Sequence, residues 1–165
     1  MRKEHRQLPK LLTVVGPTTA GKTAWSLRLA KNFDGEVISA DSRQIYKKMD
    51  IGTGKATGEW RRSGFWRLHH IEDVPHHLID FLDPGKTFNV VEFRDRAVKH
   101  IKLAHKAGRV PIVCGGTGLY VSALVDNYNI PRVPPNNKLR KSLMEKSAED
   151  LLNLLEQMDP VTAKK

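Results

Sequence analysis

The segment Gly16–Thr23 constrains the fold more than any other part of the sequence. Its residues match the phosphate-binding loop pattern G-x-x-x-x-G-K-[ST] in full. The apolar run Leu11–Val15 precedes it and has the composition of a buried strand. Residues 21–33 follow, with apolar side chains at the spacing of one helix face. A strand that passes through such a loop into a helix predicts a phosphate-binding α/β unit.

The residues of this loop have distinct roles in holding an anion. Glycine at positions 16 and 21 lets the backbone wrap closely, so that its N–H groups point at a phosphate. The start of the following helix adds the positive end of its dipole. Lys22 supplies a cation for phosphate oxygens, and Thr23 supplies a hydroxyl that can bind Mg²⁺. The diphosphate- or nucleotide-binding residues predicted in this way are Gly16, Pro17, Thr18, Thr19, Ala20, Gly21, Lys22 and Thr23.

Further strands and helices alternate along the chain. Asn89 and Glu92 form a capping-box pattern that predicts a helix from this point, and Gly108 stands where such a helix ends. Residues 52–75 lack sustained periodicity, which predicts a long loop or an irregular excursion. Strands that alternate with helices predict a P-loop NTPase-like parallel sheet with flanking helices, an α/β fold. The other predicted strands are Glu36–Ala40, Leu78–Phe81 and Val110–Cys114.

A proline-rich break after residue 130 divides the chain into two predicted parts. Residues 1–130 are interpreted as the N-terminal part of the α/β core, and residues 131–165 as the beginning of a truncated helical insertion. Within the second part, Leu139–Met158 is predicted to form two short helices. Ser147 is predicted to cap the second of them, and the Asp159-Pro160 step to end it.

Composition bounds the partners of the chain. The net charge is +10, from 28 Lys and Arg against 18 Asp and Glu, which suits a polyanionic partner but equally a solubilising surface charge. The single cysteine, Cys114, allows no internal disulfide and is interpreted as a core residue of the last predicted strand. Apolar runs are too short to cross a bilayer, and a signal-peptide pattern is absent. A cytoplasmic protein without membrane contact is therefore expected.

Several short motifs follow the phosphate-binding loop in a fixed order. They are Asp41–Tyr46 (DSRQIY), Met49–Lys55 (MDIGTGK), Pro75–Asp80 (PHHLID) and Gly115–Tyr120 (GGTGLY). Together with the Gly-Pro-Thr start of the loop, these motifs resemble the N-terminal half of the tRNA dimethylallyltransferase (tRNA isopentenyltransferase) family. The resemblance runs from about Leu11 to the end of the chain. Each motif is weak alone, and their order and spacing make the combination specific.

The resemblance implies a prenyltransferase that uses the loop for something other than nucleotide hydrolysis. The loop would hold the diphosphate of dimethylallyl diphosphate, together with Mg²⁺, and the chain would act on tRNA as a monomer. N6 of the adenosine on the 3′ side of the anticodon would attack C1 of the allyl group, and diphosphate would leave. By this resemblance Asp41 corresponds to the general base, whereas Lys22 and Thr18 would contact the diphosphate during catalysis.

The same resemblance implies a set of tRNA contacts around an extruded adenosine. Judged by residue type alone, Asp41 also suits a turn or a helix cap, Thr117 a turn hydroxyl and Arg140 an exposed helix charge. Both interpretations of these residues stay open at this point. The tRNA-binding residues implied by the family are Asp41, Ser42, Arg43, Gln44, Thr117 and Arg140.

Other functions remain compatible with these residues. A transferase that prenylates free adenine nucleotides would use the same loop, and so would a small-molecule kinase of the P-loop type. A metal-organising carboxylate is absent from the end of the Val110–Cys114 strand, which disfavours an ordinary NTPase, although Asp80 is a candidate substitute. A fragment that binds diphosphate or RNA without turnover is the non-enzymatic alternative.

Two clusters outside these motifs also carry chemistry. The first consists of His69, His70, His76 and His77. Adjacent histidines point in divergent directions, so a loop at a nucleic-acid face is favoured over a metal site. The second consists of Trp60, Phe65 and Trp66, among Arg61, Arg62 and Arg67. This mixture suits either stacking and phosphate contact with RNA or a small satellite core.

Overall fold

The computed structural model describes residues 10–128, 130 and 133–164. The side chains of Ser63 and Trp66 lie outside this description. The chain divides into two compact units, Met1–Ile130 and Pro131–Lys165, and each is described by itself. The interpretation of the second unit as the beginning of a truncated insertion stays a prediction. None of the described helices is long and apolar enough to cross a membrane.

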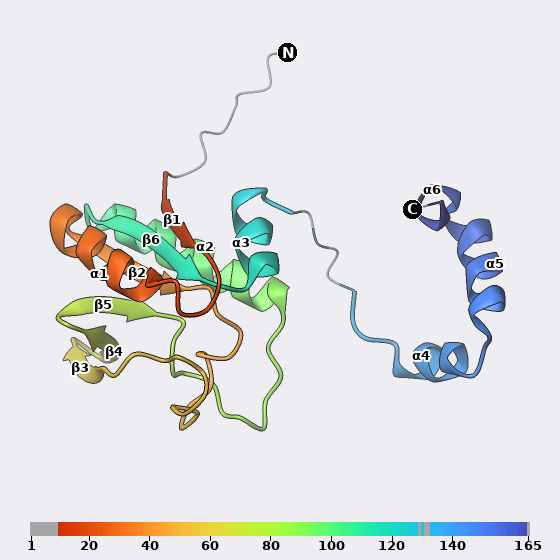
Figure 1. Ribbon diagram of the computed structural model, residues 1–165, viewed down its shortest axis with the longest axis horizontal. Helices are drawn as coiled ribbons and strands as arrows, with labels where there is room; N and C mark the ends of the chain where they lie inside the picture. The colour runs from red at the N-terminus through yellow and green to blue at the C-terminus, as the bar shows by residue number, and fades with distance from the viewer. Residues whose placement is uncertain (1–9, 129, 131–132, 165) are drawn as a thin grey trace, which may run out of the picture. The chain divides into compact units, whose positions relative to one another are not determined.

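A six-stranded sheet forms the centre of the first unit (Figure 1). Its strands are β1 (Leu12–Val15), β2 (Gly35–Ser39), β3 (Glu59–Ser63), β4 (Trp66–Ile71), β5 (Val74–His77) and β6 (Val110–Gly115). Across the sheet the order is β1-β6-β2-β5-β4-β3. β1, β6, β2 and β5 run parallel, which confirms the predicted parallel core. β4 and β3 continue the sheet in antiparallel pairing.

Helices cover both faces of this sheet. They are α1 (Lys22–Phe33), α2 (Val90–Lys106) and α3 (Gly118–Val125). Neighbouring strand residues face opposite sides, so Val37 and Ile112 pack in the cluster with residues of α1. Ile38 and Val113, one residue further on, pack in the cluster with residues of α2 and α3. All of these are 2% exposed or less. Burial of an aliphatic side chain of this size stabilises the fold by about 1.5–3 kcal/mol.

The capping signals predicted for α2 are confirmed. The Asn89 side chain accepts hydrogen bonds from the amides of Val91 and Glu92, both at 3.0 Å. In return, the Glu92 carboxylate accepts the Asn89 amide at 3.0 Å, which completes the capping box. Gly108, just past the helix end, has a φ of 74°, a conformation that glycine adopts without steric penalty.

The prediction of a long loop or irregular excursion over residues 52–75 is wrong from Glu59 onward. β3 and β4 form an antiparallel hairpin there, with Arg62 opposite Arg67, and β5 follows directly. The Gly64-Phe65 pair makes the turn, and Gly64 has a φ of 61°, as tight hairpin turns require. Charged and aromatic side chains fill both strands. The alternation of apolar and polar residues that marks a strand in a sequence is therefore weak here.

The predicted strand Leu78–Phe81 is also wrong. The strand of this region is β5, which ends one residue before it. Leu78 and Asp80 have φ values of 56° and 52°, and extended backbone does not adopt such values. Leu78 and Ile79 are nevertheless buried. The apolar run marks a piece of the core that has irregular backbone.

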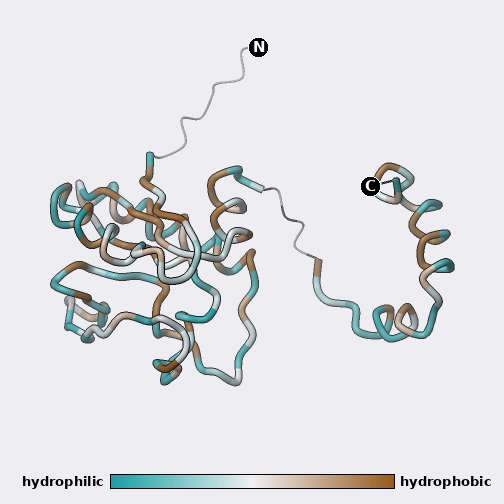
Figure 2. The backbone as a smooth tube through the Cα atoms, in the orientation of Figure 1, coloured by the Kyte–Doolittle hydropathy of each residue, from teal (hydrophilic) through white to brown (hydrophobic). Residues whose placement is uncertain are grey.

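Short helices make up the second unit. They are α4 (Asn137–Met144), α5 (Ala148–Met158) and α6 (Pro160–Ala163). α4 and α5 confirm the two predicted helices, and the Ser147 hydroxyl caps α5 by accepting the Asp150 amide at 3.1 Å. α6 was not predicted, because Pro160 ends α5 but also suits the first turn of a new helix. No residue of these helices is buried. Hydrophobic and hydrophilic residues alternate along α5 (Figure 2).

The buried His76 and the half-buried His100 make the stability of the fold depend on pH. Burial lowers the pKa of His76 and of His100 to about 4, whereas an unfolded histidine titrates near pH 6.5. Between these values the unfolded chain binds more protons than the folded chain, so stability falls as the pH falls from about 6.5 towards 4. We expect the free energy of unfolding to be lower at pH 5 than at pH 7 by about 2–4 kcal/mol.

Urea unfolding at the two pH values measures this difference. His100 stacks on His77 with ring centroids 4.2 Å apart, so His100→Phe keeps a stacking partner and removes one titrating group. This variant should lose about half of the pH dependence. His105→Gln, at an exposed position on the same helix, is the control and should keep all of it. Equal stability of the unsubstituted chain at both pH values would contradict the prediction.

Candidate active site

Three loops meet at the carboxyl edge of the parallel strands. β6 lies between β1 and β2, with Val15 opposite Gly115 and Ser39 opposite Cys114. β1 therefore delivers the phosphate-binding loop, β2 delivers Asp41, and β6 delivers the turn that contains Thr117 to the same edge. In open α/β sheets, ligands bind outside the carboxyl ends of the strands. The topology thus gathers most of the predicted site residues.

Backbone hydrogen bonds join the loops after β2 and β6. The Ala40 amide donates to the Cys114 carbonyl at 2.8 Å, and the Thr117 amide donates to the Ala40 carbonyl at 3.1 Å. A Cβ atom at position 115 would stand 2.1 Å from the Ala40 carbonyl oxygen, so only glycine fits there. The Gly-Gly-Thr motif is therefore required for this close approach, and it fixes the position of Asp41 relative to Thr117.

The phosphate-binding loop has the features of an anion site. Gly21 precedes α1 with a φ of 75°, and no side chain caps the helix. The first helical bond runs from the Trp25 amide to the Gly21 carbonyl at 3.1 Å, which leaves the amides of the preceding turn without helical partners. Lys22 Nζ donates to the Pro17 carbonyl at 2.6 Å. A phosphate oxygen is a stronger acceptor for this ammonium than a neutral carbonyl.

The loop lies directly beside the turn after β6. A Cβ atom on Gly116 would be 3.9 Å from Lys22 Nζ and 3.5 Å from the Gly16 carbonyl oxygen. A cavity of about 390 Å³ opens between the two segments. It is lined by Val15, Gly16, Pro17, Gly115, Gly116, Gly118, Val121 and Ser122. The start of the phosphate-binding loop and the turn after β6 thus form two walls of one cavity.

Asp41 combines the two interpretations that its sequence position left open. Its Oδ1 accepts the amides of Arg43 at 2.9 Å and Gln44 at 3.3 Å, which is the geometry of a turn. No hydrogen bond to Oδ2 is found in the described part of the chain, so this oxygen is available to a ligand. Thr117 Oγ1 accepts the Ser42 amide at 3.0 Å. One carboxylate oxygen therefore orients the loop, and the other can accept a proton.

The remaining predicted residues are spread over different environments. Arg43 is exposed, whereas Gln44 is half-buried and its amide donates to the Gly54 carbonyl at 3.1 Å. Arg140 lies on α4 of the second unit, and its role stays a prediction. Cys114 packs against the cluster under α1, and burial raises the pKa of its thiol. This environment suits a core residue.

The histidine cluster is placed differently from expectation. It lies on β4 and β5 within the sheet, and not on a loop as predicted. His69 and His76 are each 4% exposed, so neither is available to nucleic acid. The His77 ring contacts the Glu36 carboxylate at 2.7 Å, and this contact and Arg109 hold the pKa of Glu36 below its usual value despite burial. Within the described residues, no group of three or more His, Cys, Asp or Glu side chains is arranged to hold a metal.

Comparison with known proteins identifies the family. The family model described as IPP transferase matches residues 44–165. A second model, described as Isopentenyl transferase, matches residues 9–67. The chain belongs to the IPP transferase family. The resemblance drawn from the sequence motifs is thereby confirmed.

Curated relatives carry the name tRNA dimethylallyltransferase. The one from Syntrophus aciditrophicus (strain SB), tRNA dimethylallyltransferase 1, is 43% identical over 153 residues, which are 93% of this chain and 48% of the relative. The one from Anoxybacillus flavithermus is 40% identical over 156 residues, which are 94% of this chain and 47% of the relative. The chain thus spans about half the length of the curated relatives it matches.

Solved structures of the family have the same fold. The full-length tRNA isopentenylpyrophosphate transferase of Bacillus halodurans matches with a TM-score of 0.65 and 40% identity, over 94% of this chain and 50% of that one. A eukaryotic dimethylallyltransferase, described as acting on tRNA, matches with a TM-score of 0.72 and 28% identity, over 93% of this chain and 36% of that one. These matches confirm the predicted P-loop NTPase-like α/β fold.

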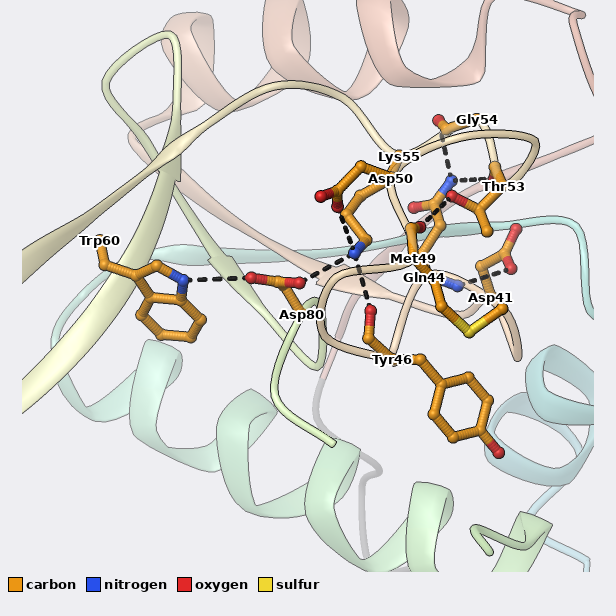
Figure 3. A network of polar contacts seen from close by, with 10 residues as sticks. All are labelled: Asp41, Gln44, Tyr46, Met49, Asp50, Thr53, Gly54, Lys55, Trp60 and Asp80. Atoms are coloured by element: carbon orange, nitrogen blue, oxygen red, sulfur yellow. Dashed lines mark hydrogen bonds and ion pairs between the residues drawn. The ribbon is translucent and has the colours of Figure 1, made fainter. Parts of the chain in front are cut away.

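A polar network beside the site of this IPP transferase family member was not predicted from the sequence (Figure 3). Lys55 is its centre, with a side chain that is 5% exposed. Its Nζ donates to the Tyr46 carbonyl at 2.7 Å and to one carboxylate oxygen each of Asp50 and Asp80 at 2.8 Å. The other Asp80 oxygen accepts the Trp60 indole N–H at 3.2 Å. Lys55 thus connects the Met49–Lys55 motif to Asp80, which follows β5, and to Tyr46 at the end of the Asp41–Tyr46 motif.

The opposite charges of this network favour the ionised forms of Lys55 and Asp80. Burial alone would raise the pKa of Asp80, but the hydrogen bonds from Lys55 and Trp60 outweigh it and hold that pKa below its usual value. Likewise, burial would lower the pKa of Lys55, and the two carboxylates raise it instead. Both oxygens of Asp80 have partners. This arrangement argues against Asp80 as the substitute metal organiser considered from the sequence.

Removal of the central cation should destabilise the fold. We expect Lys55→Met to lower the free energy of unfolding by about 1–3 kcal/mol, because it leaves the half-buried Asp80 carboxylate without its charged partner. Urea unfolding at pH 7 measures this change. Lys31→Met is the control, since the Lys31–Glu72 pair has side chains 50% and 64% exposed and contributes at most about 1 kcal/mol. If both variants lost the same free energy of unfolding, the Lys55 network would contribute no more stability than a surface ion pair.

Proposed function

We propose that the protein transfers a dimethylallyl group from dimethylallyl diphosphate to N6 of the adenosine 3′ of the anticodon in tRNA. The observation that carries this proposal is the convergence of the phosphate-binding loop and the Asp41 carboxylate at one sheet edge. Family membership supports the same reaction, because the matched relatives are named for it. It also favours prenyl transfer over the kinase alternative.

The phosphate-binding loop would bind the diphosphate of the prenyl donor. The uncapped amides at the start of α1 would donate to this charge, and the Lys22 ammonium would exchange the Pro17 carbonyl for a phosphate oxygen. Two hydroxyls fit Mg²⁺: Thr23 and Ser39 line the same small cavity, which is otherwise largely apolar, and the buried Ser39 Oγ has no hydrogen-bond partner in the described part of the chain. Mg²⁺ commonly keeps few protein ligands beside phosphate oxygens and water. When bound, it would neutralise charge on the leaving diphosphate.

The transfer step needs a proton acceptor close to the leaving group. A bond forms between adenosine N6 and C1 of the allyl group, while the C1–O bond breaks and its electron pair leaves with the diphosphate. The proton of N6 goes to the unbonded oxygen of Asp41. The amides of Arg43 and Gln44 hold the other oxygen, so the carboxylate is oriented before the substrate arrives.

The acceptor would be held by the exposed residues around Asp41. Ser42 and Arg43 are exposed beside the carboxylate, and Thr117 Oγ1 is 3.3 Å from the Ser42 hydroxyl. An adenosine that has left its base stack could enter there. The net charge of +10 suits a polyanion. We place the protein in the cytoplasm, as a monomer, because its proposed substrates are found there and the family implies no partner chain.

Nucleoside mass spectrometry tests the proposal. The protein is incubated with dimethylallyl diphosphate, Mg²⁺ and an unmodified tRNA transcript that has adenosine 3′ of the anticodon, and the tRNA is then digested. We expect one adenosine to carry a dimethylallyl group in place of a hydrogen. A transcript with guanosine at that position is the control. If the protein bound dimethylallyl diphosphate but modified neither transcript, the proposal would be wrong, and the result would support a protein that binds diphosphate without turnover.

A free adenine nucleotide is the second candidate acceptor. Neither family description, IPP transferase or Isopentenyl transferase, names tRNA, so both matches are compatible with this acceptor as well. The same assay with AMP, ADP or ATP in place of tRNA separates the two acceptors. Prenylated nucleotide with no prenylated tRNA would support the second candidate. Production of ADP from ATP without prenyl transfer would instead support the kinase alternative.

A further inference from the structure

A cationic surface lies next to the site, between the turn after Tyr46 and the β3–β4 hairpin. A pocket of about 480 Å³ is lined there by Lys47, Lys48, Asp50, Trp60, Arg67, Asp80 and Phe81. We call the residues Lys47, Lys48, Arg62, Phe65 and Arg67 the hairpin surface. None of them belongs to the motifs from which the active site was predicted.

The two acidic residues of this pocket share one buried cation, and three further cations lie beside them. Asp50 and Asp80 both accept hydrogen bonds from Lys55, which is itself almost fully buried. Lys47 and Lys48 are exposed, and Arg67 donates only to the Trp60 carbonyl among the described contacts, at 3.4 Å. In the described part of the chain, none of these three cations has a carboxylate partner. The pocket therefore carries excess positive charge.

The arginines of the hairpin differ in whether they have carboxylate partners. Arg61 points to one face, where its guanidinium bonds the carboxylates of Asp73, at 2.6 Å, and Glu59. Arg62 and Arg67 are opposite each other in the register, which assigns both to the other face of the hairpin. Arg62 Nε donates to the Gly64 carbonyl at 3.3 Å, and Arg62 also borders the cavity that Arg61 lines. Like charges directly opposite in a sheet repel each other. Their juxtaposition, without a carboxylate partner in the described part, favours an anionic ligand over a solvated ion-pair surface.

An aromatic residue stands at the tip of the same hairpin. Phe65 is 100% exposed in the turn. Exposed aromatic rings next to arginines are a common platform for bases of single-stranded nucleic acid. The turn after Tyr46 continues directly from the Asp41–Tyr46 motif. Lys47 and Lys48 of the hairpin surface thus follow the active-site loop directly, next to a Tyr46 carbonyl that accepts a hydrogen bond from Lys55.

We propose that the hairpin surface binds backbone phosphates of the RNA substrate next to the reacting nucleotide, with a base stacked on Phe65. Lys47, Lys48 and Arg67 hold one phosphate in the pocket, and Arg62 contacts the next along the strand. This inference rests on the proposed function, because it takes tRNA as the substrate. It adds a surface that fixes how the strand runs away from Asp41.

Salt-dependent RNA binding tests this surface. The affinity of the full chain for an unmodified tRNA transcript is measured by fluorescence anisotropy over a series of KCl concentrations. We expect Arg67→Gln and the double variant Arg62→Gln/Arg67→Gln to raise Kd progressively. The slope of log K against log[KCl] should become shallower by about 0.7–0.9 for each phosphate that the variant no longer binds. Arg67→Lys should restore most of the affinity, since it keeps the charge.

Arg61→Gln is the matched control. It removes the same charge from the same hairpin, at a guanidinium that carboxylates already neutralise, and it should leave the salt slope unchanged. An equal loss of affinity in Arg61→Gln and Arg67→Gln would overturn the proposal, because it would reduce the effect to net charge. The thermal midpoint of each variant shows whether it is folded, and Phe65→Ala tests the stacking contribution without any change of charge.

Failure of this inference differs from failure of the proposed function. If tRNA is prenylated and Arg67→Gln binds RNA like Arg61→Gln, the proposed function stands, and the proposal that the hairpin surface binds RNA is wrong. If the variants change the salt slope as expected but no acceptor is ever prenylated, the hairpin surface stands and the proposed reaction is wrong. Affinity for inorganic diphosphate should be the same in all hairpin variants, since none of them touches the phosphate-binding loop.

Discussion

Replacement of Asp41 by asparagine is expected to lower the rate of prenyl transfer by about 10²–10⁴-fold, the usual contribution of a positioned proton acceptor. The asparagine side-chain oxygen can still accept the amides that now bind Oδ1, so the loop after β2 should keep its shape. The substitution removes the negative charge and the basicity of the other oxygen. Diphosphate affinity should therefore stay nearly unchanged, because that ligand is held by a different loop.

Single-turnover measurements with saturating tRNA separate the chemical step from binding. Titration of each variant with inorganic diphosphate and Mg²⁺ gives the affinity. Asp50→Asn is the control, since it also converts an aspartate of this region to an amide, but one whose side chain is 70% exposed and bonded to Lys55. An unchanged single-turnover rate would remove Asp41 from the mechanism. Loss of diphosphate affinity in parallel with the rate would show instead that Asp41 organises the metal.

The second large effect concerns the lysine of the phosphate-binding loop. Lys22→Ala is expected to weaken binding of inorganic diphosphate by about 2–4 kcal/mol, which corresponds to about 30- to 900-fold in Kd. Lys22 Nζ donates to the Pro17 carbonyl, 2.6 Å away, and a bound phosphate would replace this neutral acceptor by a charged one. Because the lysine also stabilises the leaving charge, prenyl transfer should fall at least as much as affinity.

Isothermal titration calorimetry with Mg²⁺ and inorganic diphosphate measures this change. Lys31→Ala is the control on the same helix: Lys31 lies in the last turn of α1 and pairs with Glu72 at 2.8 Å. It should bind diphosphate like the unsubstituted chain. Near-normal affinity of Lys22→Ala would show that the loop amides alone hold the anion, and the assignment of Lys22 would be wrong.

The parts of the fold that could be predicted were those with short-range signals. The loop Gly16–Thr23 is a local motif, and the cap made by Asn89 and Glu92 is complete within one helical turn. The convergence of Asp41 and Thr117 could be anticipated from the rule that loops after parallel strands share one edge. Each of these features depends on residues close in sequence or on a general property of the sheet.

Features that depend on contacts between distant segments could not be predicted. Lys55 reaches Asp80, 25 residues further on, and nothing in either motif indicates the pairing. The hairpin did carry one signal, the Gly64-Phe65 pair between two runs of large side chains, which fits a tight turn. Leu78 and Ile79 looked like a strand because burial selects apolar residues whatever the backbone conformation.

The uncapped start of α1 has a consequence for the lifetime of the protein as well as for binding. A ligand that supplies the missing acceptor for these amides binds the folded chain and not the unfolded one, so it shifts the folding equilibrium by mass action. At a concentration 100 times its Kd, such a ligand adds about 2.7 kcal/mol to stability. The supply of isoprenoid diphosphate in a cell would then set how much of the chain is exposed to proteases at any moment.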